Sequence, residues 1–125
     1  MKQDLELMRK ILFAIEEQYQ PGEETMWGPS IDGYDIATVA EHCQILCDKG
    51  LIRSFLASRG NDQIMNFRIG NLTADGYDYL GQVRDDKVWK TIKAVADEEN
   101  APKTLESFSK LAGVFWGNFF DQMKG

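Results

Sequence analysis

Residues 36–80 read IATVAEHCQILCDKGLIRSFLASRGNDQIMNFRIGNLTADGYDYL, and this stretch decides the fold. A helical pattern closes on Cys47-Asp48-Lys49-Gly50-Leu51-Ile52-Arg53. A second helix opens at Leu72-Thr73-Ala74-Asp75-Gly76-Tyr77-Asp78-Tyr79-Leu80. Between them lie two alternating segments around a turn, so the stretch predicts a helix, a β-hairpin and another helix.

The first helix of this stretch is predicted from its caps and its apolar stripe. Asp32 or Asp35 can cap its start, and Gly50 stands where a left-handed C-cap is favoured. The inner stripe is predicted to be Ile36, Val39, Ala40, Cys43, Leu46 and Cys47, and the outward face Thr38, Glu41, His42, Ile45, Asp48 and Lys49.

The hairpin is predicted from Leu51 to Ser58 and from Ile64 to Ile69, with a turn at Gly60-Asn61-Asp62. Thr73 can then accept backbone N–H groups of the following turn. This predicts a helix from Thr73 to about Val83, with Tyr77 and Leu80 facing inward.

The remaining sequence predicts further helices and one ordered loop. An amphipathic helix is predicted over 4–18, and residues 20–34 form a loop pinned by Trp27, with a short strand near Ser30–Asp32. Asp85 or Asp86 can start another helix. After Asn100-Ala101-Pro102, a last helix follows whose apolar positions are Leu105, Phe108, Leu111, Ala112, Phe115, Trp116, Phe119 and Met123.

The order of helix, helix, Gly-Leu-Ile, hairpin and Leu-Thr-x-x-Gly-x-x-x-Leu resembles winged-helix proteins. The segments Asp4–Leu12, Val39–Leu46, Leu72–Leu80 and Arg84–Trp89 are also similar to an uncharacterised family of small bacterial and prophage-borne proteins, a domain of unknown function. This resemblance covers about residues 1–95. It implies a winged-helix-like fold and a phage or mobile-element setting, but no catalytic or ligand residue.

The predicted fold class is therefore α+β, mainly α. We expect a winged-helix-like domain over residues 1–86, and C-terminal helices over 87–125 that pack on its core or form a dimer contact. Little room remains between the first helix and Ile36 for the separate helix that normally crosses the DNA backbone.

Composition bounds the functional class. The 125 residues suffice for one globular core, and 14 Lys+Arg against 20 Asp+Glu give a net charge of -6, which opposes a nonspecific grip on DNA phosphates. The first residues lack the apolar run of a signal peptide, and no stretch approaches the ~20 apolar residues that span a bilayer. We expect a cytoplasmic protein without membrane contact, with two free thiols.

Cations of the helix end and the hairpin are the candidate nucleic-acid contacts. Major-groove readout by the first helix of residues 36–80 is disfavoured, because Glu and Asp on its outward face repel phosphate. The residues proposed to contact double-stranded DNA are Lys49, Arg53, Arg59 and Arg68. The three arginines belong to the predicted β-hairpin, which would be the wing of a winged helix. The alternative interpretation is that the hairpin charges are simply solvated.

No catalytic, metal or cofactor site is predicted. His42 is expected to point away from Cys43 and Cys47, and no fourth ligand has the usual spacing, so we expect no zinc. One histidine and no nucleophile motif do not build an acid–base site, so the chain is not expected to be an enzyme.

Apolar residues supply the candidate protein contacts. Ile45 is isolated on a polar face, and the C-terminal helix carries more aromatic surface than a small domain normally needs. The candidate contact residues are Ile45, Phe115, Trp116 and Phe119, and we expect a homodimer. Packing onto the same chain is the alternative for both.

Two functions follow from these patterns. The first is a DNA-associated transcriptional regulator from a phage or mobile element, with a helix-turn-helix that is degenerate. The second is a protein-interaction or assembly module that keeps the winged-helix scaffold without DNA binding. Fold analogy alone does not choose between them.

Overall fold

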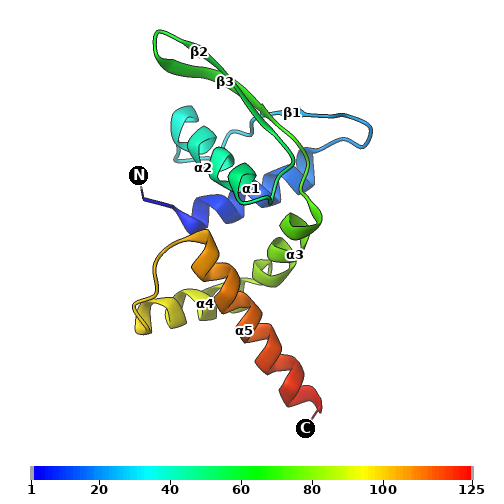
Figure 1. The fold of residues 1–125 in the computed structure, drawn as a ribbon, viewed down its shortest axis with the longest axis vertical. Coiled ribbons are helices and arrows are strands. Elements are labelled where there is room, and N and C mark those ends of the chain that lie inside the picture. Colours follow the sequence, from blue (N-terminus) through cyan, green and yellow to red (C-terminus); the bar gives the residue numbers. More distant parts are fainter. Residues whose placement is uncertain (1, 125) are drawn as a thin grey trace. The chain divides into compact units, whose positions relative to one another are not determined.

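A computed structural model describes residues 2–124 and divides into two compact units. One unit is Glu6–Tyr77. The other combines the N-terminal residues up to Leu5 with the chain from Asp78 onward. The predicted fold class, α+β and mainly α, is confirmed, since helices predominate and a three-stranded antiparallel sheet accompanies them, an arrangement compatible with a winged helix (Figure 1).

The Glu6–Tyr77 unit contains most of α1 (Leu5–Gln18), then β1 (Met26–Trp27), α2 (Ile36–Asp48), β2 (Phe55–Gly60), β3 (Gln63–Ile69) and the start of α3 (Ala74–Val83). The strands lie in the order β1-β3-β2, and the β2–β3 hairpin packs against α2 (Figure 1). No helix forms between β1 and α2, so the segment that would hold a backbone-crossing helix is a loop.

Two strand predictions need correction. The short strand of the loop lies at Met26–Trp27, where it pairs with β3, and not near Ser30–Asp32. The Gly28 N–H still donates to the Phe67 carbonyl at 2.8 Å, but Pro29 comes next and has no N–H to extend the ladder, which explains why β1 is so short. The first hairpin strand begins at Phe55 rather than Leu51, and before it Ile52 forms only an isolated antiparallel bridge with Leu72.

The limits of α2 follow the predicted caps. Asp35 accepts a hydrogen bond from the Thr38 N–H at 2.8 Å, and this bond lowers the pKa of the Asp35 carboxyl. At the other end Gly50 has φ +77°, the left-handed conformation that favours glycine, and its N–H donates to the Cys47 carbonyl.

Two side chains of α2 differ from prediction. His42, predicted to face outward, is only 1% exposed, whereas Ile36, predicted to be inward, is 45% exposed. The Nδ1–H of His42 donates to the Thr38 carbonyl at 2.8 Å, so its polar edge is satisfied within the helix and the ring can be buried. The buried stripe is therefore rotated from the predicted one.

Thr73 joins the end of α2 to the start of α3, as its predicted capping role requires. Its hydroxyl donates to the Gly50 carbonyl at 2.5 Å and accepts from the Gly76 N–H at 3.0 Å, while its own N–H donates to the Leu51 carbonyl. Gly76 fits because a Cβ there would lie 2.1 Å from the Leu51 carbonyl oxygen. We call these contacts the Thr73 clamp.

One position of α3 was predicted wrongly. Tyr77 was expected to face inward, but it is exposed and its hydroxyl lies near the Asn71 side chain. Tyr79 is the buried tyrosine, and Leu80 is buried as predicted. The Thr73 clamp determines the rotation of the helix, because it fixes Gly76 against the backbone of residue 51.

The other unit contains the end of α3, α4 (Asp86–Glu98) and α5 (Leu105–Lys124). Asp85 caps α4 by accepting from the N–H groups of Lys87 and Val88 at 2.8 and 3.1 Å. The first half of α5 packs on α4, with the rings of Trp89 and Phe108 5.6 Å apart. The predicted pair of C-terminal helices is therefore present.

Substitutions in the Thr73 clamp should be destabilising. We expect Gly76→Ala to lower the free energy of unfolding by about 2 kcal/mol or more, because the added methyl group collides with backbone. Thr73→Val should cost about 1 kcal/mol through loss of the cap. Urea denaturation followed by circular dichroism measures both.

Gly81→Ala is the matched control, because Gly81 lies in the same helix and an added Cβ meets nothing within 4 Å. It should be neutral or stabilise by up to about 1 kcal/mol. Equal effects of the two glycine substitutions would contradict this role of the clamp.

Candidate interaction surfaces

The outward face of α2 is acidic. Asp35, Glu41 and Asp48 are exposed there and Lys49, just after the helix, is the cation. Ile45 is half-buried, which leaves part of its side chain accessible. Carboxylates are repelled by DNA phosphates, and this face carries more carboxylates than cations. It is therefore poorly suited to the major groove.

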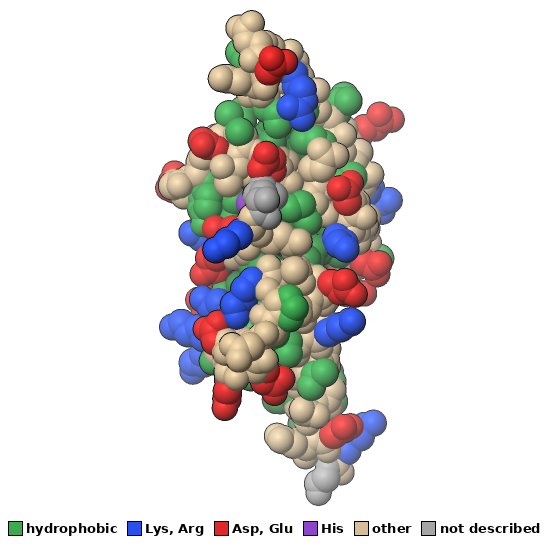
Figure 2. Space-filling model, turned by 60° about the vertical axis from the view of Figure 1, so that its left-hand side comes forward, with side chains coloured by type: hydrophobic (Ala, Val, Ile, Leu, Met, Phe, Trp, Pro, Cys, Tyr) green, Lys and Arg blue, Asp and Glu red, His purple; other side chains and the backbone are tan. Residues whose placement is uncertain are grey.

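Three of the four proposed DNA contacts are exposed but dispersed. Lys49 follows α2, Arg53 precedes β2, and Arg59 lies in β2 beside the hairpin turn. At about 3.3 Å per residue, Arg53 and Arg59 are separated by roughly 20 Å along the strand direction. Figure 2 shows acidic and basic side chains interspersed over the face that it presents.

The fourth proposed contact, Arg68, is held within the chain. Its Nε–H donates to the Thr25 hydroxyl at 2.8 Å, and Nη2 donates to the Thr25 carbonyl at 3.0 Å. The guanidinium also lies over the Trp27 ring, 4.4 Å from its centroid. These contacts fix the position of the arginine. No local sequence pattern predicts this pairing, since Thr25 and Arg68 lie 43 residues apart.

The pairing of three strands sets the surroundings of Arg68. Trp27 and Leu56 are both Cα partners of Arg68, from the strands on either side. Directly paired residues of antiparallel strands point to the same face of a sheet. Trp27 is 60% and Leu56 71% exposed. The Trp27–Arg68–Leu56 row thus presents a cation between two exposed apolar side chains.

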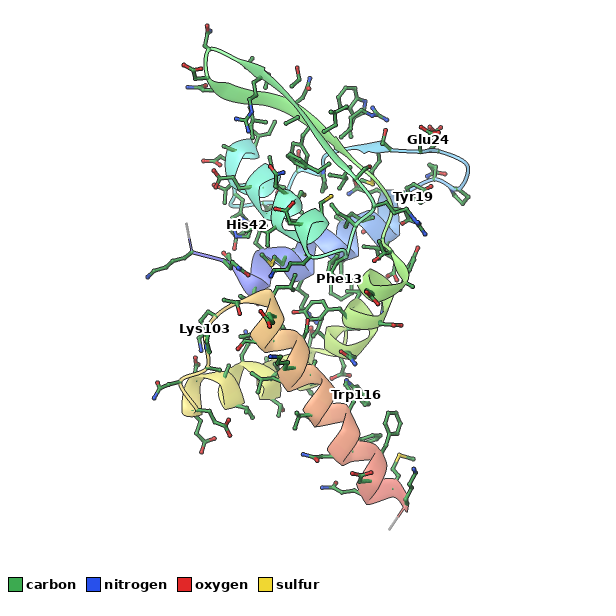
Figure 3. The ribbon with its side chains drawn as sticks, in the orientation of Figure 1. Phe13, Tyr19, Glu24, His42, Lys103 and Trp116 are labelled. Atoms are coloured by element: carbon green, nitrogen blue, oxygen red, sulfur yellow. The ribbon has the colours of Figure 1, made fainter. Side chains whose placement is uncertain are left out.

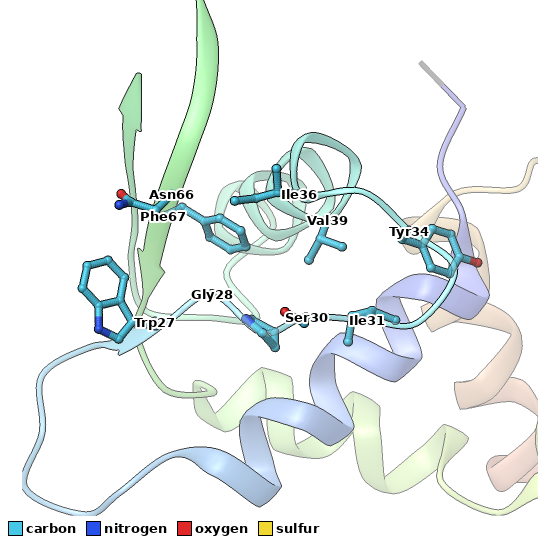
Figure 4. A pocket seen from close by; sticks show the side chains of 10 residues that line it. Trp27, Gly28, Ser30, Ile31, Tyr34, Ile36, Val39, Asn66 and Phe67 are labelled. Atoms are coloured by element: carbon cyan, nitrogen blue, oxygen red, sulfur yellow. The ribbon is translucent and has the colours of Figure 1, made fainter. Parts of the chain in front are cut away.

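A pocket of about 260 Å³ lies where β1 ends (Figure 4). It lies between β3, the loop after β1 and the start of α2, and its lining includes Phe67, Ile36, Val39, Tyr34 and Trp27. Ser30 and Asn66 add polar groups to this lining, but no Asp, Glu, Lys, Arg, His or Cys lines the pocket, so its walls carry no acid–base pair.

The cysteines and His42 do not form a metal centre in the described part of the chain. Within residues 2–124 no group of three or more His, Cys, Asp or Glu side chains is placed to hold a metal ion. Burial raises the pKa of the Cys43 thiol to about 12. Burial, followed by the neighbouring Asp48 carboxylate, raises the pKa of Cys47.

The distal half of α5 carries the remaining aromatic residues. Trp116 donates its Nε1–H to the Gln82 carbonyl at 2.9 Å, which fixes the indole against the end of α3 (Figure 3). The Phe115 and Phe119 rings each pack edge-on against the Trp116 ring, with ring centroids 5.3 Å apart in both pairs. Phe115 and Trp116 are half-buried, whereas Phe119 is 42% and Phe120 54% exposed.

The apolar stripe of α5 continues beyond its buried part. Leu105, Phe108 and Ala112 are buried, and steps of three and four residues carry the same helical face to Trp116, Phe119 and Met123. Met123 is 70% exposed. The sequence predicted this stripe but not the point at which its burial ends.

These features define a mainly helical α+β protein, compatible with a winged-helix-like arrangement, with two exposed apolar surfaces. The chain belongs to the DUF2513 family of hypothetical proteins, whose pattern matches residues 2–102. It is also 28% identical over 112 residues to an uncharacterised protein of Haemophilus influenzae, covering 90% of this chain and 92% of that protein. No solved structure matches the chain. The resemblance to an uncharacterised family is thereby confirmed.

The family match ends before α5 begins at Leu105. Within residues 2–124 no helix is both long enough and apolar enough to cross a bilayer.

The raised thiol pKa values predict low reactivity. At pH 8 a thiol with a pKa of about 12 is almost entirely protonated, so Cys43 of the folded protein should resist a thiolate-directed disulfide reagent. Reaction should become rapid in urea, when burial is lost. The Cys47→Ser variant isolates Cys43 for this measurement, and rapid modification of that variant without denaturant would contradict the burial of Cys43.

Proposed function

We propose that the chain is a protein-interaction module on a winged-helix-like scaffold, and that it assembles through the distal half of α5 with a second copy of itself. The observation that supports this is the continuous apolar stripe of α5, which is buried from Leu105 to Ala112 and exposed at Phe119 and Met123. Binding, not catalysis, is the proposed role.

The energetics favour a partner for this surface. Burying a large apolar side chain contributes about 1.5–3 kcal/mol relative to leaving it in water. Phe119, Phe120 and Met123 are adjacent on the last turns of the helix, and Trp116 is already fixed by its bond to Gln82. Because the indole is already ordered, it loses little conformational entropy when a partner binds.

Two copies of the chain can bury this surface by packing their α5 helices against each other. A twofold axis across two α5 helices would place each exposed stripe against the other, and such self-complementary contacts close after two subunits. The proposed partner contacts Phe115, Trp116 and Phe119 lie on this face, whereas Ile45 belongs to α2 and is not required for the pairing.

The double variant Phe119→Glu/Met123→Glu tests the assembly. We expect the wild-type protein to have a dimer mass in light scattering after gel filtration, and the variant to weaken association at least about a hundredfold, because carboxylates replace two buried apolar groups.

Val114→Glu is the matched control, since Val114 is exposed on a different side of the same helix. It should leave the mass unchanged. A wild-type monomer at high concentration, or equal effects of both variants, would overturn the proposed assembly.

DNA association through the wing is the second candidate function. It is supported by the winged-helix-like strand order and by the exposure of Lys49, Arg53 and Arg59. It is opposed by the net charge of -6 and by the acidic face of α2. Protein contact is therefore the better-supported role.

Binding of a labelled random duplex, measured by fluorescence anisotropy between about 20 and 200 mM salt, separates the two functions. We expect no saturable binding at low salt. Saturable binding that weakens steeply with salt, and is lost on replacing Lys49, Arg53 and Arg59 by Ala, would instead favour the DNA role.

A further inference from the structure

The Trp27–Arg68–Leu56 row has the features of a binding site for a carboxylate. Arginine has five N–H donors, and the Thr25 contacts occupy one edge of the guanidinium, formed by Nε and one N–H of Nη2. The other edge, formed by Nη1 and the second N–H of Nη2, has the spacing that matches the two oxygens of a carboxylate.

The cation is already ordered before any partner binds. Two hydrogen bonds to Thr25 and the stacking on Trp27 hold the guanidinium in one position, so docking would not require a flexible arginine to be immobilised. Lysine could not reproduce this arrangement, because it lacks the planar fork and its fixed geometry.

The side chains beside Arg68 indicate which residues should flank the carboxylate in the bound segment. Trp27 and Leu56 flank Arg68 from the adjacent strands, and both are mostly exposed. Exposed apolar side chains beside a fixed cation match a segment that carries apolar residues next to one acidic residue.

The charge distribution favours a single carboxylate over a polyphosphate. The row contains one cation, Arg68, between Trp27 and Leu56. The chain as a whole carries a net charge of -6. A nucleic-acid strand would require several cations along its backbone. One acidic side chain requires only one.

We propose that this face of the sheet binds a segment of a partner protein in which an Asp or Glu lies next to apolar residues. The carboxylate pairs with the free edge of Arg68, and the apolar side chains cover Trp27 and Leu56. The inference extends the proposed interaction role to a second surface, in the Glu6–Tyr77 unit, and does not depend on pairing through α5.

Selection of random peptides displayed on phage tests this proposal. The full chain and its variants Leu56→Glu and Phe119→Glu are used as separate targets. The wild-type protein and Phe119→Glu should enrich peptides with Asp or Glu beside apolar residues, and Leu56→Glu should not. Phe119 lies on α5, outside the row, so Phe119→Glu should disturb α5 pairing without changing the row. Peptide enrichment on this variant therefore tests the row independently of α5 assembly.

A synthetic version of an enriched peptide then tests the carboxylate contact by titration. Replacing its acidic residue by the corresponding amide should weaken binding about tenfold or more, since a charge-assisted contact to Arg68 is lost. Arg68→Lys should have a similar effect on the acidic peptide and little further effect on the amide peptide. The peptide exchange leaves the protein fold untouched, so it remains decisive if Arg68→Lys folds poorly.

Several results would overturn the proposal. They are the absence of any enriched peptide, enrichment of the same peptides on Leu56→Glu, equal binding of the acidic and amide peptides, and displacement of the peptide by random duplex or single-stranded DNA. The last outcome would assign the row to nucleic acid.

Discussion

The Thr73 clamp is the interaction on which the Glu6–Tyr77 unit depends. One hydroxyl bridges the Gly50 carbonyl at the end of α2 and the Gly76 N–H at the start of α3. The hairpin lies between these two points in the sequence, so the clamp closes the loop that contains β2 and β3. Gly76 is required because no Cβ fits against Leu51.

The exposed side chains of this unit limit what it can bind. The α2 face exposes Glu41 and Asp48, and Arg68 is turned to Thr25 and Trp27. The order of helices and strands is compatible with a winged helix, but the α2 face presents carboxylates where DNA-reading helices present cations. Protein contact follows from these surfaces more directly than DNA contact.

Much of the fold could be predicted because its signals are local. Asp35, Gly50, Thr73 and Asp85 act on neighbouring backbone groups, and each cap was predicted from residues within one turn. The burial of His42 and the Thr25–Arg68 pair could not be predicted, because they depend on packing and pairing between distant segments. For the candidate site, the sequence indicated the aromatic stripe of α5 and the hairpin cations, but not which of them remain exposed.

The central claim is that α5 of one copy pairs with α5 of another. Hydrogen–deuterium exchange of the backbone amides in residues 113–124, measured at increasing protein concentration, tests this most directly. Pairing predicts that exchange in this segment slows as concentration rises, while exchange in the exposed turn at Asn61 and Asp62 stays constant. Exchange in residues 113–124 that is fast and independent of concentration would contradict the account.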